Sequence, residues 1–108
     1  MKRFALFIIL ILISGCIQQK TAPEQVPATE KATSLCVNLC KSELSKGTDL
    51  SNGPCLSNEI IPDWVCDVAH SPRQAIDNMP ENQCSGFREG TAHHFVEIDT
   101  SCNLIKTY

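Results

Sequence analysis

Three histidines and the acidic residues near them are the side chains of this sequence that could bind a metal ion. His93 and His94 stand together in AHHFVEIDTSC, residues 92–102, and His70 follows Asp67 in the run WVCDVAH. Neighbouring side chains of a strand point to opposite faces, so His93 and His94 cannot bind one ion unless the strand is bulged. A metal site would therefore use His70, His93 or His94 with Asp67. Otherwise one histidine packs beside the following phenylalanine and bonds to the backbone, while the other is exposed.

Cysteines are the second set of reactive side chains, with seven in 108 residues. Cys16 stands apart near the N-terminus, and the rest are Cys36, Cys40, Cys55, Cys66, Cys84 and Cys102. An even set in a small domain outside the cytoplasm indicates disulfides. Spacing alone does not settle the pairing. Our preferred arrangement bonds Cys36 and Cys40 to Cys66 and Cys102, which leaves Cys55 with Cys84.

The N-terminal segment indicates export and a lipid anchor. Lys2 and Arg3 precede the apolar run FALFIILILI, residues 4–13, which is too short to span a bilayer, and ISGC follows at residues 13–16. This segment resembles the lipobox signal peptide of prokaryotic membrane lipoprotein precursors. The resemblance implies removal of residues 1–15, a diacylglyceryl group on Cys16 and further acylation, for example by palmitate. We therefore expect a protein anchored by lipid in the cell membrane, on its extracytoplasmic side.

The remainder divides into a tether and a domain. Residues 16–33 contain the lipidated cysteine followed by a proline-containing polar stretch, which is typical of a flexible linker. Residues 34–108 carry five Lys/Arg against ten Asp/Glu, a formal charge of about minus five. No basic stripe is present to follow a phosphate backbone, so nucleic acid is not an expected partner.

Hydrophobic periodicity predicts a small α+β domain. A helix capped by Thr33 or Ser34 should begin at Leu35 and end at Gly47, and the spacing of its two cysteines places both on one face. Strands are expected at residues 64–70, 93–99 and 103–108, with mostly loop at residues 71–84. We therefore predict a disulfide-rich domain with one N-terminal helix packed on a two- or three-stranded antiparallel sheet and long loops. The only tryptophan, in the first strand, should lie in the core.

The run HHFVEID is also similar to the histidine strand of transglutaminase-like and papain-like cysteine enzymes. The resemblance implies Cys84 as nucleophile, His93 or His94 as base, and Asp99 or Glu97 as the acid that orients the ring. Those folds separate the cysteine from the histidine by far more chain, and using Cys84 would leave one other thiol without a partner. Such hydrolase-like activity is the third of our hypotheses.

Two arginines could bind a ligand carboxylate. Arg73 and Arg88 are the only arginines of residues 34–108, and the alternative is a salt bridge to an acid close in sequence, namely Asp77, Glu81 or Glu89. The leading hypothesis is a non-enzymatic binding or surface module that presents loops to a protein or a small molecule and needs no cofactor. The metal-binding domain is the second hypothesis.

Overall fold

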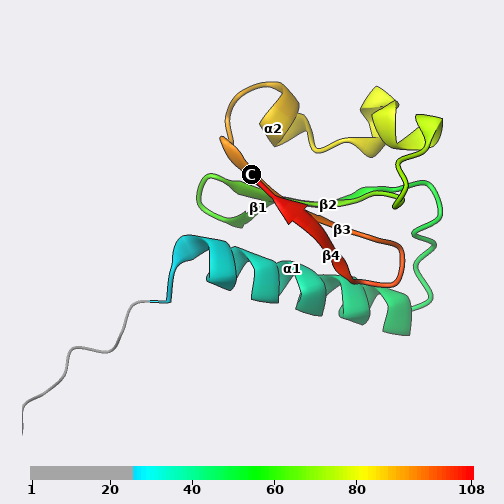
Figure 1. Ribbon diagram of the computed structural model, residues 1–108, viewed down its shortest axis with the longest axis horizontal. Coiled ribbons are helices and arrows are strands. Elements are labelled where there is room, and N and C mark those ends of the chain that lie inside the picture. The colour runs from blue at the N-terminus through cyan, green and yellow to red at the C-terminus, as the bar shows by residue number, and fades with distance from the viewer. Residues whose placement is uncertain (1–25) are drawn as a thin grey trace, which may run out of the picture.

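A computed structural model describes residues 26–108 of the chain. One long helix covers one face of a four-stranded sheet, and an irregular segment with three short helices lies over the other face (Figure 1). The predicted α+β class, with one helix packed on a disulfide-linked sheet, is confirmed. The expected signal peptide and Cys16 lie outside the described residues, so their assignment stays a prediction.

The long helix α1 spans Ala28–Ser45 and begins well before Leu35, the predicted start. Its first turns contain strong helix formers, and the acidic side chain of Glu30 lies in the first turn, where the helix dipole favours negative charge. Ala32 is completely buried against the sheet, so this segment is part of the domain. The C-terminal part of the predicted tether is therefore helix. Gly47 follows the helix with a φ of 83°, the left-handed conformation expected at that position.

Four strands form the sheet, in the order β1-β2-β3-β4. They are β1 (Cys55–Ile61), β2 (Trp64–Val68), β3 (His94–Ile98) and β4 (Leu104–Thr107). The outer pairs are antiparallel, but β2 and β3 are parallel, which corrects the expectation of an antiparallel sheet. β1 was not predicted, because its sequence CLSNEII has polar residues in the middle and its pairing with β2 contains register shifts.

A long connection makes the parallel pair possible. Parallel strands require a crossover that returns the chain to the same end of the sheet. Here the crossover contains the 3₁₀ helices η1 (Ala75–Asn78) and η2 (Pro80–Asn82) and the short helix α2 (Ser85–Arg88). In Figure 1 this yellow segment lies on the side of the sheet opposite α1. The predicted loop at residues 71–84 is thus mostly confirmed, with two single helical turns inside it.

Three disulfides connect the layers, and their pairing agrees with the preferred arrangement. Cys36 of α1 bonds to Cys66 of β2, and Cys40 bonds to Cys102. The third bond joins Cys55 and Cys84. Cys102 lies in the turn between β3 and β4 with a φ of 67°, not on a strand.

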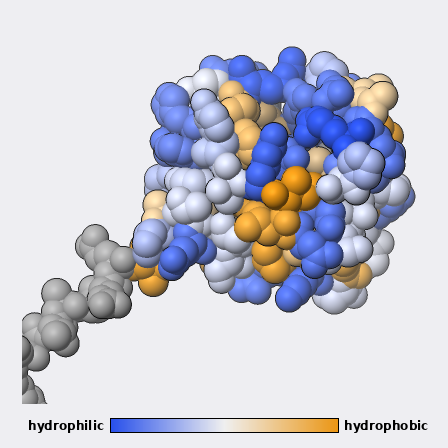
Figure 2. Space-filling model, viewed as in Figure 1, coloured by the Kyte–Doolittle hydropathy of each residue, from blue (hydrophilic) through white to orange (hydrophobic). Residues whose placement is uncertain are grey.

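The main core lies between α1 and the sheet. The side chains Trp64, Val68, Val96 and Ile98 are buried there together with two of the disulfides. Trp64 is 6% exposed, as predicted for a core residue, and its ring stacks on His94 with centroids 4.6 Å apart. Apolar side chains also reach the surface near the edge strand β4, where Leu104 is half exposed, and Figure 2 shows an apolar patch with polar surroundings on this side of the molecule.

We predict that removing the Cys40–Cys102 bond by replacing both residues with alanine lowers the free energy of unfolding by about 2 to 5 kcal/mol. This bond closes 62 residues of chain and both of its cysteines are buried, whereas the Cys55–Cys84 bond closes 29. Because a longer loop constrains the unfolded chain more, the matched Cys55→Ala/Cys84→Ala variant should lose less stability. Urea unfolding of both variants measures the difference. Equal stability of wild type and the first variant would contradict the prediction.

Candidate functional site

The histidines predicted as candidate metal ligands lie at different ends of the β2–β3 pair. His70 follows the C-terminal end of β2, whereas His94 lies opposite Trp64 at the N-terminal end of the β2–β3 pair. Asp67 lies between these ends, one residue before Val68. Across residues 26–108, no three His, Cys, Asp or Glu side chains are grouped closely enough to hold a metal ion. The predicted set of His70, His93 or His94 with Asp67 is therefore not assembled.

Each histidine instead has a local partner. His93 Nδ1 lies 2.6 Å from Asp63 Oδ1, and His94 Nε2 lies 3.6 Å from the other oxygen of this carboxylate. The hydrogen bond from His93 holds the pKa of Asp63 below its ordinary value. Asp63 occupies the turn between β1 and β2, so the paired histidines attach this turn to the start of β3. At the other end of the sheet, His70 Nδ1 lies 2.9 Å from Asp77 Oδ1.

The thiol and imidazole of the hydrolase hypothesis are not brought together. Cys84 is oxidised in its bond to Cys55 and so offers no nucleophilic thiolate. Asp99 accepts hydrogen bonds from the backbone N–H groups of Ser101 and Asn103, so it shapes the β3–β4 turn and does not orient a histidine ring.

A cavity of about 430 Å³ lies on the sheet face opposite α1. Because side chains alternate along a strand, the residues between those that face α1 point to this side. Residues from β2, β3, β4 and the crossover line the cavity, and they comprise an acidic pair, three basic side chains and an apolar group. The acids are Asp67 and Glu97, the bases are Arg73, Arg88 and Lys106, and the apolar side chains include Val65, Phe87 and Phe95.

The acidic pair arises from the strand register. Asp67 is paired directly with Glu97 across the parallel strands, and Glu97 is paired with Lys106 on β4. Glu97 is 7% exposed and accepts a hydrogen bond of 3.1 Å from Arg73 Nη1. Asp67 Oδ1 is buried and has no hydrogen-bond partner within the described part of the chain. Burial and the neighbouring Glu97 charge raise the pKa of Asp67 to about 7.

Arg73 reaches Glu97 because the loop before η1 is fixed. The Asp77 side chain is fully buried and accepts hydrogen bonds from the backbone N–H groups of His70 and Gln74, at 3.0 and 2.8 Å. Although burial alone would raise the pKa of Asp77, these hydrogen bonds hold it below its ordinary value. The partner of Arg73 is thus Glu97, from a distant part of the sequence, and none of the neighbouring acids predicted for it. Arg73 Nη2 donates a hydrogen bond to the backbone carbonyl of Asp77 and forms no ion pair with the Asp77 carboxylate.

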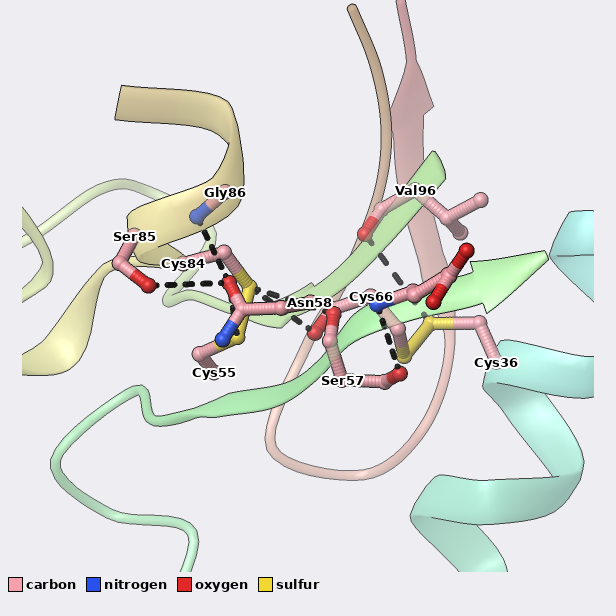
Figure 3. Close-up of a disulfide and its surroundings, with 10 residues drawn as sticks. Cys36, Cys55, Ser57, Asn58, Cys66, Cys84, Ser85, Gly86 and Val96 are labelled. Carbon is pink, nitrogen blue, oxygen red and sulfur yellow. Dashed lines mark hydrogen bonds between the residues drawn. A yellow bond between two sulfur atoms is a disulfide. The ribbon is translucent and has the colours of Figure 1, made fainter. Parts of the chain in front are cut away.

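Helix α2 carries the opposite wall of the cavity and is fixed to β1. Figure 3 shows Cys84, just before α2, bonded to Cys55 at the start of β1. The side chain of Asn58 accepts hydrogen bonds from the Gly86 N–H at 2.8 Å and from the Ser85 hydroxyl at 3.4 Å. Gly86 is buried, and a Cβ at this position would lie 3.2 Å from Asn58 Oδ1. This close contact places the following residues of α2 over the sheet.

Phe87 and Arg88 of α2 line the cavity together with Phe95 of β3 and Lys106 of β4. The Phe87 ring meets the Phe95 ring edge-on, with centroids 5.0 Å apart. Lys106 Nζ lies 5.6 Å from the centre of the Phe95 ring. Neither Arg88 nor Lys106 forms an ion pair with another residue of the described chain. Two positive charges at the cavity are therefore not engaged in an ion pair, although Glu97 lies opposite Lys106 in the sheet.

Sequence reasoning named Asp67 and Glu97 in other roles and Arg73 and Arg88 as side chains that could bind a carboxylate, and it missed Lys106 and the two phenylalanines. A signal was present, because VCD at residues 65–67 and FVE at residues 95–97 both place an apolar and an acidic side chain on one face of a strand. These pairs lie side by side because the two strands are parallel, and the sequence pattern does not show strand direction.

Replacing Asp67 with asparagine should stabilise the protein at pH 8. The folded pKa of about 7 lies above the ordinary 3.8, so ionisation of Asp67 opposes folding and wild-type stability falls as pH rises from about 4 to 7. At about 1.36 kcal/mol per pKa unit, Asp67→Asn should gain about 2 to 4 kcal/mol at pH 8 and nearly nothing at pH 4. Urea unfolding at both pH values measures this, and a variant without a gain at pH 8 would contradict it.

Comparison with protein families, with curated proteins and with solved structures found no significant match to this chain. Among the residues that the structure describes, no helix has both the length and the apolar character needed to cross a membrane. The function must therefore be argued from the cavity, the disulfides and the N-terminal sequence.

Proposed function

We propose that this protein is a lipid-anchored extracytoplasmic domain that binds a small ligand with an anionic group in the cavity between the sheet and α2. The observation that carries the proposal is the position of the basic side chains. Three of the five Lys/Arg of the acidic segment 34–108 line one cavity. Arg73 is paired with Glu97, but Arg88 and Lys106 form no ion pair in the described chain, and unpaired charges in a cleft attract the opposite charge of a ligand.

The size and lining of the cavity support a small molecule. Its volume of about 430 Å³ lies within the usual range of roughly 300 to 1,000 Å³ for ligand sites. Aromatic side chains on one wall and a few polar groups on the floor are the usual composition of such sites. Arg88 offers a planar set of donors suited to a carboxylate or a phosphate, and Lys106 offers a second positive charge. A ligand anion would supply the counter-charge that both lack.

The proposed location follows from the disulfides and the lipobox. All six cysteines of residues 26–108 are paired in disulfides, and such bonds persist in oxidising compartments. The segment ISGC supplies the cysteine that would carry the lipid. Membrane and small ligand are thus the proposed partners.

The anchor predicts a defined N-terminus. The protein purified from membranes should begin at Cys16, should carry the mass of a diacylglyceryl group, and should incorporate a labelled fatty acid. Cys16→Ser should abolish both the label and the cleavage, whereas Ser14→Ala should preserve them because alanine is also small. An unlabelled mature chain, or one cleaved elsewhere, would argue against the anchor.

The cavity predicts weak binding of a simple aromatic carboxylate. Mature protein labelled with ¹⁵N, in non-ionic micelles, should bind 3-phenylpropionate with amide shifts at residues 65–67, 87–88 and 95–97. Arg88→Gln with Lys106→Gln should weaken this binding by about tenfold or more, because both counter-charges are lost.

A matched control separates the cavity from net charge. Lys31 and Lys41 lie on α1, are exposed and form no ion pair in the described chain, so Lys31→Gln with Lys41→Gln removes the same charge elsewhere. This control should bind 3-phenylpropionate as wild type does. Equal weakening in both variants, or no shifts at the cavity, would count against the proposed site.

A further inference from the structure

Beyond an anionic group, the cavity contains a second set of unmet interactions. Asp67 Oδ1 is buried without a hydrogen-bond donor, beside Glu97 in the neighbouring strand. A buried carboxylate oxygen without a partner is unfavourable, because it has lost water and gained nothing in exchange. Glu97 already bonds to Arg73, so Asp67 is the acid of the cavity floor that has no ion-pair partner in the described chain.

The cavity side chains that form no ion pair in the described chain, Asp67, Arg88 and Lys106, come from three different elements. The two acids belong to β2 and β3 at the floor, whereas Arg88 comes from α2 and Lys106 from β4. An anion alone would satisfy the bases and leave Asp67 without a donor. A cation alone would pair with Asp67 and leave Arg88 and Lys106 without an anion. A ligand with an ammonium group and a carboxylate on one short skeleton satisfies both sets, and an apolar side group can lie against Phe87 and Phe95.

We infer that the ligand is a free α-amino acid with an apolar or aromatic side chain, bound through its ammonium group to Asp67 and through its carboxylate to Arg88 and Lys106. This inference rests on the proposed function, because it names the ligand class of the same cavity. The ammonium group pairs with the Asp67 carboxylate, which lines the cavity and forms no ion pair in the described chain, and Glu97 adds a second negative charge beside it. The aromatic wall selects the side chain by apolar contact.

Binding should depend on pH in a defined direction. The ammonium group prefers ionised Asp67, so affinity for an amino acid should rise between pH 5.5 and 8, on either side of the Asp67 pKa of about 7. The other charged groups that face Asp67 come from the elements around it, namely Glu97, Arg73, Asp77, Arg88 and Lys106. Of the acids among them, Asp77 has its pKa held below the ordinary value by hydrogen bonds from the His70 and Gln74 backbone N–H groups, although its burial acts in the opposite direction. The pH dependence should therefore follow Asp67.

The test compares three probes that share one ring and differ in their charged groups. L-phenylalanine carries both charges, 3-phenylpropionate only the carboxylate, and phenethylamine only the ammonium group. Titrations of the ¹⁵N-labelled mature protein at pH 8 should give about tenfold tighter binding for phenylalanine than for either other probe. At pH 5.5 the advantage over 3-phenylpropionate should shrink to a few-fold, because Asp67 is then mostly protonated.

Variants test whether Asp67 causes the pH-dependent advantage of phenylalanine over 3-phenylpropionate. Asp67→Asn should abolish the pH-dependent advantage of phenylalanine at pH 8 and leave the binding of 3-phenylpropionate unchanged or slightly stronger. Glu59→Gln removes an exposed acid on β1, away from the cavity, and should behave as wild type. Since Asp67→Asn is expected to stabilise the fold, a loss of binding in this variant would not reflect unfolding.

The outcomes separate the inference from the proposed function. Equal binding of phenylalanine and 3-phenylpropionate would overturn the amino-acid inference and leave an anion site. Phenethylamine binding as tightly as phenylalanine would overturn the role of Arg88 and Lys106. An advantage of phenylalanine that survives in Asp67→Asn would overturn the role of Asp67. Failure of all three probes to shift the cavity resonances would overturn the proposed function itself.

Discussion

The attachment of α1 to the sheet is the constraint on which the rest of the domain depends, and two of the three disulfides take part in it. Of the 18 residues of this helix, only Ala32, Cys36 and Cys40 are buried. Two of these three are the disulfide cysteines, and Val37 packs partly buried against the same core, so sulfur makes up much of what the helix buries. A domain of this size buries little apolar surface and needs such bonds. The layered arrangement thus depends on oxidised cysteines, which supports the proposed location.

The second organising feature is the parallel pairing of β2 and β3. It places Asp67 beside Glu97, and it also requires the long crossover that passes over the same face of the sheet. That crossover supplies Arg73, Phe87 and Arg88. One topological choice therefore produces both the floor and the opposite wall of the cavity. The third disulfide and Asn58 then keep α2 at a fixed place over the strands.

Local patterns predicted the elements better than their arrangement. The cysteine spacing and Gly47 located most of α1, and the alternation in residues 64–70 located β2. The start of α1 was misplaced because Thr33 and Ser34 look like capping residues, although the helix continues through them. Strand direction cannot be inferred from a period of two, which is the same for parallel and antiparallel pairs. The pairing of Asp67 with Glu97 could therefore not be predicted from the sequence. The same is true of the contact between Arg73 and Glu97, which lie 24 residues apart in the chain.

The unpartnered oxygen of Asp67 links occupancy of the cavity to the lifetime of the protein. At neutral pH the empty cavity holds a carboxylate that opposes folding, and a bound positive group would remove that penalty in addition to adding contacts. Proteases at a cell surface cleave chains when they open, and a more stable chain opens less often. An occupied domain should therefore be degraded more slowly than an empty one. With the proposed anchor and ligand, the amount of protein on the membrane would then follow the supply of the ligand without any change in synthesis.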